Sequence, residues 1–294
     1  MSTNHSSGST DKFPKFAPKI NHKKMSNPII HIGLHKTGTT YLQSSLFPNL
    51  KNYNVYRGYE SHRQLLKLGR EKKIIISDEG ISGDLWGMNY LNDFKENIYF
   101  LKKTYNNPKI IFGIRNHSSF ILSVYKQYLY EKGTNDLDFL YNINNTGIIK
   151  SEELLLLPKI TLLRESFEKV FIYSQESLIS NENDFISALT NFLDTDINSN
   201  YQSQKDSNVG VNTILQVKTL QRMNRFSKSL EKLHPSLGWY NKVCRKLKIT
   251  PRDICQKRLR NFKSEKFDLD NKTKHFMDDF FKDDWLNASK NVSY

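Results

Sequence analysis

A lysine, two glycines and three threonines lie close together near the start of the chain, and these residue types are suited to binding an anion. The segment is Gly33-Leu34-His35-Lys36-Thr37-Gly38-Thr39-Thr40. A glycine-rich turn that leads into a helix directs backbone N–H groups and the positive end of the helix toward one point. The lysine ammonium and the threonine hydroxyls add further donors. The segment therefore predicts an anion site, most often one for phosphate.

The position of the lysine separates this segment from the phosphate-binding loop of ATP and GTP hydrolases. In that loop, Gly-x-x-x-x-Gly-Lys-Ser/Thr, the lysine follows the second glycine and reaches the β- and γ-phosphates. Gly33 and Gly38 keep the spacing of the glycines. Thr39 stands at the lysine position, however, and Lys36 comes two residues before the second glycine. An ordinary nucleotide hydrolase is disfavoured, and a glycine-rich turn with a solvated lysine is the structural alternative.

A second set of donors follows the apolar segment Lys109–Ile114. Arg115 ends this expected strand, and Ser118 is the expected N-cap of the helix after it. Ser123 lies within the first two turns of that helix, so its hydroxyl and the Arg115 guanidinium can reach one anion beyond the carboxyl ends of the strands. Arginine presents a fork of donors that suits phosphate, and a serine hydroxyl adds another donor.

Glu79 is the candidate general base. The strand expected over Lys73–Ser77 delivers Asp78-Glu79-Gly80 to its carboxyl end. A carboxylate at the rim of an apolar strand is expected to have a raised pKa, which suits proton removal near neutral pH. A salt bridge or a helix cap is the alternative role for Glu79, and His35 is the alternative base. No convincing cluster of metal ligands is found in the sequence, so no metal is expected.

The two donor sets together resemble those of sulfotransferases that use 3′-phosphoadenosine 5′-phosphosulfate (PAPS). Lys36-Thr37-Gly38-Thr39-Thr40 is similar to their 5′-phosphosulfate loop, and an arginine eight positions before a serine, Arg115 and Ser123, is similar to their 3′-phosphate-binding segment. Less specific similarity to bacterial members extends over about residues 28–290. His117 and Gly210 depart from the pattern, because a proline and a hydroxyl residue are usual there. The segments of weaker similarity are Ile75–Ser82, Tyr173–Leu178 and Ser207–Asn212.

This resemblance implies transfer of a sulfuryl group from PAPS to an acceptor hydroxyl or amine by in-line displacement, with 3′-phosphoadenosine 5′-phosphate (PAP) as product and no requirement for a metal. The acceptor implied is a saccharide, as for the carbohydrate-type members, or another molecule with a hydroxyl or amine. The resemblance assigns catalysis to Lys36 and Glu79. It assigns nucleotide binding to His35, Lys36, Thr37, Gly38, Thr39, Thr40, Arg115 and Ser123.

The elements that position these residues alternate between strands and helices. Helical spacing of apolar residues predicts, among others, a short helix at Gln64–Leu68 and one closing helix at Asp270–Leu286. Alternation at crossover distances indicates a parallel sheet with helices on both faces. We expect an α/β fold of the P-loop type, with three α/β/α layers and about five parallel strands. The apolar runs that predict these strands are Ile29–Ile32, Asn54–Tyr56, Lys73–Ser77, Lys109–Ile114 and Lys169–Tyr173.

The composition indicates one domain behind a polar tail. A chain of 294 residues, of which 37% are hydrophobic, can bury a large core. Residues 1–24 are expected to be disordered, and residues 25–294 are expected to form the domain, with a basic helical part over about 212–294. No apolar run has the length of a signal peptide or a membrane span, and Cys244 and Cys255 lack metal-ligand spacing. These features predict a cytoplasmic protein with reduced cysteines.

The net charge of +14 is concentrated late in the chain. From Lys218 to Lys263 there are fourteen Lys and Arg residues against Glu231 and Asp253, a balance of +12. A basic surface can steer an acidic partner toward the site, and a solvated helix face is the alternative. A non-enzymatic protein that binds nucleic acid or another polyanion is a competing function, although aromatic residues for base stacking are sparse there. A small-molecule kinase is the competing enzyme, and the oligomeric state stays open.

Overall fold

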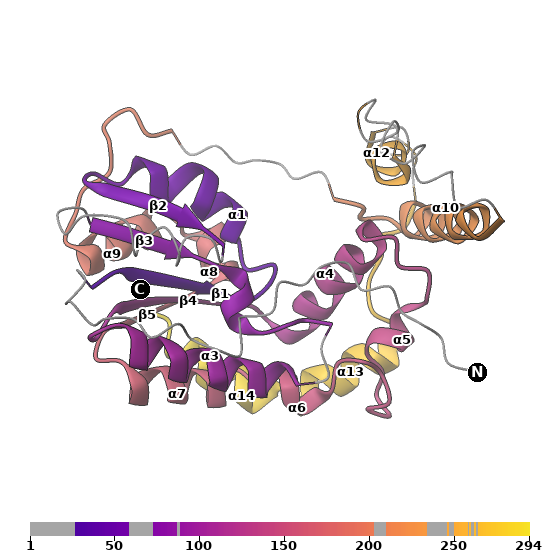
Figure 1. The fold of residues 1–294 in the computed structure, drawn as a ribbon. Coiled ribbons are helices and arrows are strands. Elements are labelled where there is room, and N and C mark those ends of the chain that lie inside the picture. Colours follow the sequence, from indigo (N-terminus) through magenta and orange to yellow (C-terminus); the bar gives the residue numbers. More distant parts are fainter. Residues whose placement is uncertain are drawn as a thin grey trace.

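Five parallel strands form the centre of the structure (Figure 1). The computed structural model describes residues 27–58, 73–86, 89–202, 210–233, 246, 250–257, 259, 262 and 264–294. Neighbouring strands are parallel throughout the sheet, in the order β2-β3-β1-β4-β5. This arrangement confirms the predicted α/β fold. The strands are β1 (Ile29–Gly33), β2 (Tyr53–Arg57), β3 (Lys73–Ser77), β4 (Lys109–Ile114) and β5 (Val170–Ser174).

Both faces of the sheet are buried, because successive residues of a strand point to opposite sides. In β1, Ile30 and Ile32 belong to the larger hydrophobic core, whereas Ile29 belongs to the smaller core on the other face. The same alternation runs through β4, where Phe112 faces the larger core and Ile111 the smaller one. The nearly continuous apolar runs of the sequence follow from this burial on two sides.

Helices cover the two faces in separate layers (Figure 1). Against the larger core lie α3 (Tyr90–Thr104), α4 (His117–Tyr130), α7 (Leu157–Ser166), α13 (Asn271–Phe280) and α14 (Lys282–Ser289). Against the smaller core lie α8 (Gln175–Ser180), α9 (Glu182–Leu193) and the segment that starts as α1 (Thr39–Tyr41) and continues as a π turn (Leu42–Leu46) and a 3-10 turn (Phe47–Asn49). Two short helices, α5 (Leu137–Leu140) and α6 (Ser151–Leu154), connect α4 to α7.

The strand order changes direction around β1, which lies between β3 and β4. The chain builds β2 and β3 on one side of β1 and then crosses to build β4 and β5 on the other side. In open parallel sheets, ligands bind at such a switch point, beyond the carboxyl ends of the strands. The segments that follow β1, β3 and β4 all leave the sheet at this edge, and they carry the predicted site residues.

The late helices α10 (Ile214–Leu233) and α12 (Pro251–Lys257) lie beside α4, on the side away from the sheet (Figure 1). The Asn224 side chain is buried and fixes α10 against the end of α4. Its Nδ2 donates to the carbonyl oxygens of Leu129 at 2.7 Å and Gly133 at 2.9 Å. The Leu129 carbonyl belongs to the last turn of α4, where carbonyl groups lack partners inside the helix, and Gly133 lies three residues beyond the end of the helix. α10 begins at Ile214, two residues into the basic helical part expected over about 212–294.

Two local predictions are wrong. Asn116, not Ser118, is the N-cap of α4, because the Asn116 side-chain oxygen accepts from the backbone N–H groups of Ser118 and Ser119. The single closing helix is divided into α13 and α14 at Phe281, which has φ −97° and ψ 5° and is buried. The tail over residues 1–24, the helix predicted at Gln64–Leu68 and Cys244 lie outside the described residues. Cys255 is buried and free.

Candidate functional site

The loop between β1 and α1 has the backbone conformation of a tight anion-binding turn. Gly38 has φ 94°, in the left-handed region that favours glycine, and an added Cβ would lie 3.0 Å from Leu178. Lys36 has φ 66°, a conformation that non-glycine residues adopt rarely and mostly at functional sites. At Gly33, a Cβ would lie 2.2 Å from Thr39 Oγ1. Glycine is therefore required at both ends of the loop.

Arg115 joins the second donor set to this loop. Its Nη1 donates to the Lys36 carbonyl oxygen at 2.8 Å, and its Nε donates to Ser119 Oγ at 2.9 Å. The Glu176 carboxylate accepts from the Ser119 hydroxyl at 3.2 Å and from the Asn116 backbone N–H at 3.1 Å. The structure thus brings the loop and the arginine segment together at one edge of the sheet. A ligand with two anionic groups can contact both.

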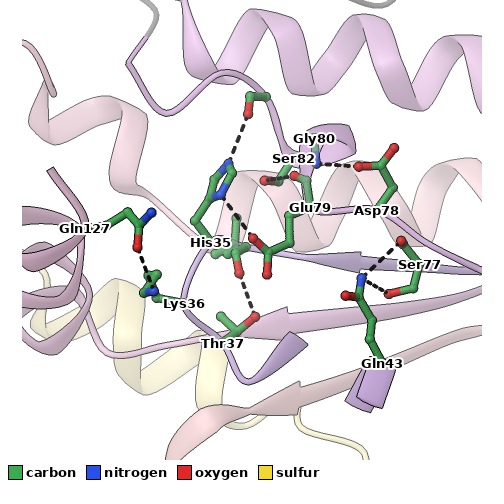
Figure 2. A network of polar contacts seen from close by, with 12 residues as sticks. His35, Lys36, Thr37, Gln43, Ser77, Asp78, Glu79, Gly80, Ser82 and Gln127 are labelled. Carbon is green, nitrogen blue, oxygen red and sulfur yellow. Dashed lines mark hydrogen bonds and ion pairs between the residues drawn. The ribbon is translucent and has the colours of Figure 1, made fainter. Parts of the chain in front are cut away.

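Glu79 and His35 face each other at the same edge (Figure 2). His35 Nδ1 lies 3.4 Å from Glu79 Oε2, and His35 Nε2 lies 3.3 Å from the carbonyl oxygen of Gly83. Burial raises the pKa of Glu79, but the hydrogen bond and charge of His35, the nearby Thr39 hydroxyl and the charge of Lys36 lower it, and the net shift is downward. The predicted raised pKa is therefore wrong, because these neighbours together outweigh the desolvation of the carboxylate.

The Lys36 side chain reaches α4, where its Nζ donates to Gln127 Oε1 at 3.2 Å (Figure 2). Burial lowers the pKa of Lys36, nearby Glu79 opposes that shift, and the charges of Arg115 and Arg252 lower it further. The ammonium is partly desolvated and has two cations near it. An anion placed at the loop would stabilise its charged form.

The three threonines of the loop have different environments. Thr37 is fully buried, and its Oγ1 donates to the Leu34 carbonyl oxygen at 2.7 Å. Thr40 is exposed. Thr39 is 2% exposed, and among the described residues no partner lies within hydrogen-bond distance of its Oγ1, although the hydroxyl is near enough to Glu79 to lower the pKa of that carboxylate. A buried hydroxyl without a partner costs about 1–3 kcal/mol, so the loop fits an added anion that accepts from Thr39.

Ser123 lies half-buried on α4, four residues beyond Ser119, and within the described part of the chain no hydrogen bond to its hydroxyl is formed. Ser119 and Gln127 were not predicted as site residues. They lie on the same side of α4 as Ser123. From Arg115 onward the polar positions 115, 119, 123 and 127 recur every four residues, which places them on one helix face. That spacing was the signal that could have identified them.

Glu176 was also missed as a site residue, although the sequence contained a clue to it. It is the second residue after β5, and its carboxylate contacts Ser119 and Asn116 as described above. In a parallel sheet, residues directly beyond different strands share one edge. Its place after the last strand was therefore the indication that it reaches the site.

His117 is part of the core rather than of the loop edge. It is 3% exposed, its Nε2 lies 3.0 Å from Asp284 Oδ2, and its ring stacks on Phe281 with centroids 4.2 Å apart. The Asp284 carboxylate also accepts from the backbone N–H groups of Leu156 at 2.8 Å and Leu157 at 3.0 Å, where α7 begins. The contact between His117 and Asp284 therefore joins the starts of α4, α7 and α14.

The segment before α10 lies along the far half of α4. Of the loop Ser207–Asn212, one of the segments of weaker similarity, only Gly210 to Asn212 are described. The Val211 backbone N–H donates to Tyr130 Oη at 2.7 Å, and Lys126 Nζ donates to Asn212 Oδ1 at 2.9 Å. These contacts bring the end of that loop next to the helix that carries Ser119, Ser123 and Gln127.

No group of three or more His, Cys, Asp or Glu side chains in the described ranges is arranged to hold a metal ion. The helices there also lack the length and apolar character that crossing a membrane requires.

Comparison with known proteins gives similarity at the level of solved structures. No family model matches the sequence, and no curated protein matches it. The structure of a sulfotransferase from Alicyclobacillus acidocaldarius is similar at 13% identity with a TM-score of 0.46, over 62% of this chain and 87% of that chain. The mouse sulfotransferase SULT7A1 complexed with PAP is similar at 15% identity with a TM-score of 0.39, over 60% of this chain and 62% of that chain. At these values, the function has to be argued from the residues of the site.

Proposed function

We propose that this protein transfers a sulfuryl group from PAPS to a hydroxyl or amine of an acceptor and releases PAP, with residues 25–294 as the catalytic domain. The observation that carries the proposal is the 2.8 Å hydrogen bond from Arg115 Nη1 to the Lys36 carbonyl oxygen. It supports a site in which the loop binds the 5′ end of one nucleotide while Arg115 and Ser123 bind its 3′-phosphate. The unpartnered Thr39 hydroxyl supports an anion at the loop.

The residues of the site suit this reaction chemically. When bound, PAPS supplies the sulfuryl group and the phosphate oxygen that leaves, so the acceptor bond to sulfur forms as the sulfur–phosphate oxygen bond breaks. The Lys36 ammonium and the loop N–H groups stabilise the negative charge that develops on the leaving oxygen. Glu79 accepts the proton of the acceptor, and His35 holds the carboxylate in its ionised form.

We further propose that the acceptor is a saccharide with acidic groups. Five cations are exposed along the described part of α10, while Val217, Leu220 and Asn224 are buried. Such a row of positive charge attracts a polyanion and increases its local concentration near the site. The exposed cations are Lys218, Arg222, Arg225, Lys228 and Lys232.

The first experiment compares nucleotide binding by calorimetry. We expect the purified protein to bind PAP and to show weaker or no binding of ATP with magnesium. The reverse preference would favour a small-molecule kinase. Salt-dependent binding of DNA without any affinity for PAP would favour a nucleic-acid-binding protein.

The second experiment measures transfer of labelled sulfate from PAPS to a panel of neutral glycans, acidic glycans, phenols and peptides. We expect label on the acidic glycans, with a rate that falls as salt is added because exposed charges are screened. A variant with Lys218→Glu and Arg222→Glu should lose this preference and keep its affinity for PAP. Label on phenols or peptides alone would contradict the saccharide acceptor and leave sulfuryl transfer intact.

A further inference from the structure

Two aromatic side chains, Trp86 and Tyr128, meet beside the loop and complete a closed circuit of contacts with it. Trp86 follows the segment after β3, and its ring centroid lies 6.0 Å from that of Tyr128 on α4. Tyr128 is next to Gln127, whose Oε1 accepts from Lys36 Nζ (Figure 2). Lys36 is next to His35, whose Nε2 lies 3.3 Å from the backbone carbonyl three residues before Trp86. These contacts keep the two rings beside the residues proposed to carry out the transfer.

Phe139 of α5 extends this pair of rings to the surface. Its ring centroid lies 6.1 Å from that of Tyr128, and the residue is 44% exposed. Trp86 and Tyr128 are half-buried, so part of each is also accessible to solvent. The three residues come from three separate elements and form one patch, which we call the aromatic platform. A contiguous apolar patch next to a polar site is typical of a surface that a ligand covers.

The Tyr128 ring at the centre of the platform is held by the turn after α4. Its Oη accepts from the backbone N–H groups of Thr134 and Asn135, both at 3.2 Å. A Cβ at Gly133 would lie 2.3 Å from the Tyr128 ring, so a larger residue there would displace the ring. The ring is therefore in place before a ligand binds, which reduces the entropic cost of binding.

The same turn is attached to the basic helix α10. Arg225 Nε donates to the Thr134 carbonyl oxygen at 2.8 Å, and Gln221 Nε2 donates to Asp136 Oδ1 at 2.8 Å. The exposed Arg225 guanidinium lies 3.8 Å from the exposed Asp136 carboxylate, and an ion pair of that kind is weak. The positive charge of α10 thus lies at the edge of the aromatic platform and is accessible to an anionic ligand.

A carbohydrate with acidic groups fits this combination of surfaces. One face of a pyranose ring carries C–H groups that pack on aromatic rings, whereas its edge carries hydroxyl groups that need polar partners. Carboxylates or sulfates elsewhere on the same saccharide are attracted by the cations of α10. A phenol also packs on aromatic rings, but it has no group that reaches α10.

We propose that the aromatic platform binds a sugar ring of the acceptor and that Arg225 binds an acidic group further along the same saccharide. The sugar on the platform presents its hydroxyl or amine to Glu79, and the rest of the saccharide extends along α10. The ligand is therefore an acidic oligosaccharide and not a single sugar. This inference rests on the proposed sulfuryl transfer and states where its acceptor binds.

The test of the platform measures acceptor binding to the PAP-saturated protein by calorimetry. The two probes are a tetrasaccharide of alternating uronate and hexosamine units and the same tetrasaccharide after reduction of its carboxyl groups. Phe139→Leu should weaken binding of both by about threefold to tenfold and leave PAP affinity unchanged, because leucine is apolar but lacks the flat aromatic face. Phe280→Leu is the matched control, since Phe280 is 51% exposed on α13, and it should bind both probes like wild type.

The test of the charge uses Arg225→Gln with the same two probes. This variant should weaken binding of the acidic tetrasaccharide by about threefold and leave binding of the reduced one unchanged, because an exposed charge contributes modestly. Lys51→Gln is the control, since Lys51 is an exposed cation beside the exposed Asp196 carboxylate.

Wild-type affinity for both probes in Phe139→Leu, or an equal loss in Phe280→Leu, would overturn the role of the platform. Wild-type affinity for the acidic probe in Arg225→Gln would overturn the contact with the acidic group. A wild-type protein that binds PAP but neither tetrasaccharide would overturn the whole inference. A wild-type protein without affinity for PAP would instead contradict the proposed function.

Discussion

Lys36 Nζ donates to Gln127 Oε1 at 3.2 Å, which ties the loop after β1 to a helix 91 residues later in the chain. The contact holds the ammonium at the edge of the sheet where Arg115 also contacts the loop. Gln127 is neutral, so the lysine charge has no full ionic partner in this contact. The charge is therefore available to an anionic ligand.

Replacing Lys36 should weaken nucleotide binding and abolish most of the transfer. Lys36→Ala should weaken PAP binding by about tenfold to a hundredfold, since a hydrogen bond to a charged group contributes ~1.5–3 kcal/mol. Calorimetry with PAP measures the change. Lys51→Ala is the control, because Lys51 is exposed and its partner is the exposed Asp196 at 3.4 Å. An unchanged affinity in Lys36→Ala would remove the lysine from the nucleotide site.

Glu79→Gln should lose most of the transfer activity and keep its affinity for PAP. Glutamine has nearly the same shape as glutamate but cannot accept the proton of the acceptor. The comparison needs the sulfate-transfer rate and the calorimetric PAP affinity of the same variant. Full turnover by Glu79→Gln would show that another group is the base.

The pH dependence of transfer tests the link between His35 and Glu79. The pKa of Glu79 is lowered from its ordinary 4.5, so the base stays ionised below that pH, and the acid limb of the wild-type rate profile should lie below pH 4.5. His35→Asn removes one cause of the lowering, so the acid limb should move to higher pH. A profile that does not move would mean that Glu79 does not control this limb.

Arg115→Ala should reduce discrimination between PAP and adenosine 5′-phosphate, which lacks the 3′-phosphate. The ratio of the two affinities should fall by about tenfold or more, because a charge-assisted contact to one phosphate is lost. Ser119→Ala should give a smaller fall, since the Ser119 hydroxyl holds the Arg115 guanidinium at 2.9 Å. Ser118→Ala serves as the control, as the Ser118 hydroxyl donates to Asp278 at 3.3 Å instead. An unchanged ratio in Arg115→Ala would exclude a role in reading the 3′-phosphate.

Asp284→Asn should destabilise the fold by about 2 kcal/mol at pH 7, because a buried carboxylate with three hydrogen-bond donors is replaced by an amide. Burial raises the pKa of Asp284, but its bonds from His117, Leu156 and Leu157 lower it, with a net downward shift from 3.8. A lowered pKa means that the stabilisation is present above the ordinary carboxyl pKa and is lost as pH falls through the lower folded value. Urea unfolding of wild type and Asp284→Asn at neutral and acid pH measures how the difference in their free energy of unfolding depends on pH.

The neighbouring Asp283 provides the control for that experiment, because its side chain is exposed at the start of α14. Asp283→Asn should change the free energy of unfolding by less than about 0.5 kcal/mol at either pH. A difference between wild type and Asp284→Asn that did not shrink as the pH fell below the ordinary carboxyl value of 3.8 would contradict the role of the ionised carboxylate.

The local features of the site could be predicted from the sequence. The strand before the loop, the Gly33–Gly38 spacing and the place of Arg115 at a strand end all depend on neighbouring residues, and the structure has them where they were predicted. The N-cap of α4 was predicted two residues too late, because Asn116 and Ser118 are both good caps and only the backbone conformation distinguishes them.

The sequence by itself determined the order of strands and helices, the parallel sheet and the anion-binding character of the loop, because apolar periodicity and turn residues act over short distances along the chain. Tertiary structure alone decided which side chains far apart in the sequence contact one another. His31 meets Tyr173 across 142 positions, and His117 meets Asp284 across 167. The lowered pKa of Glu79 likewise depends on which side chains surround it once the chain has folded. Pairings between distant residues follow from sheet register and helix packing, which no local pattern contains.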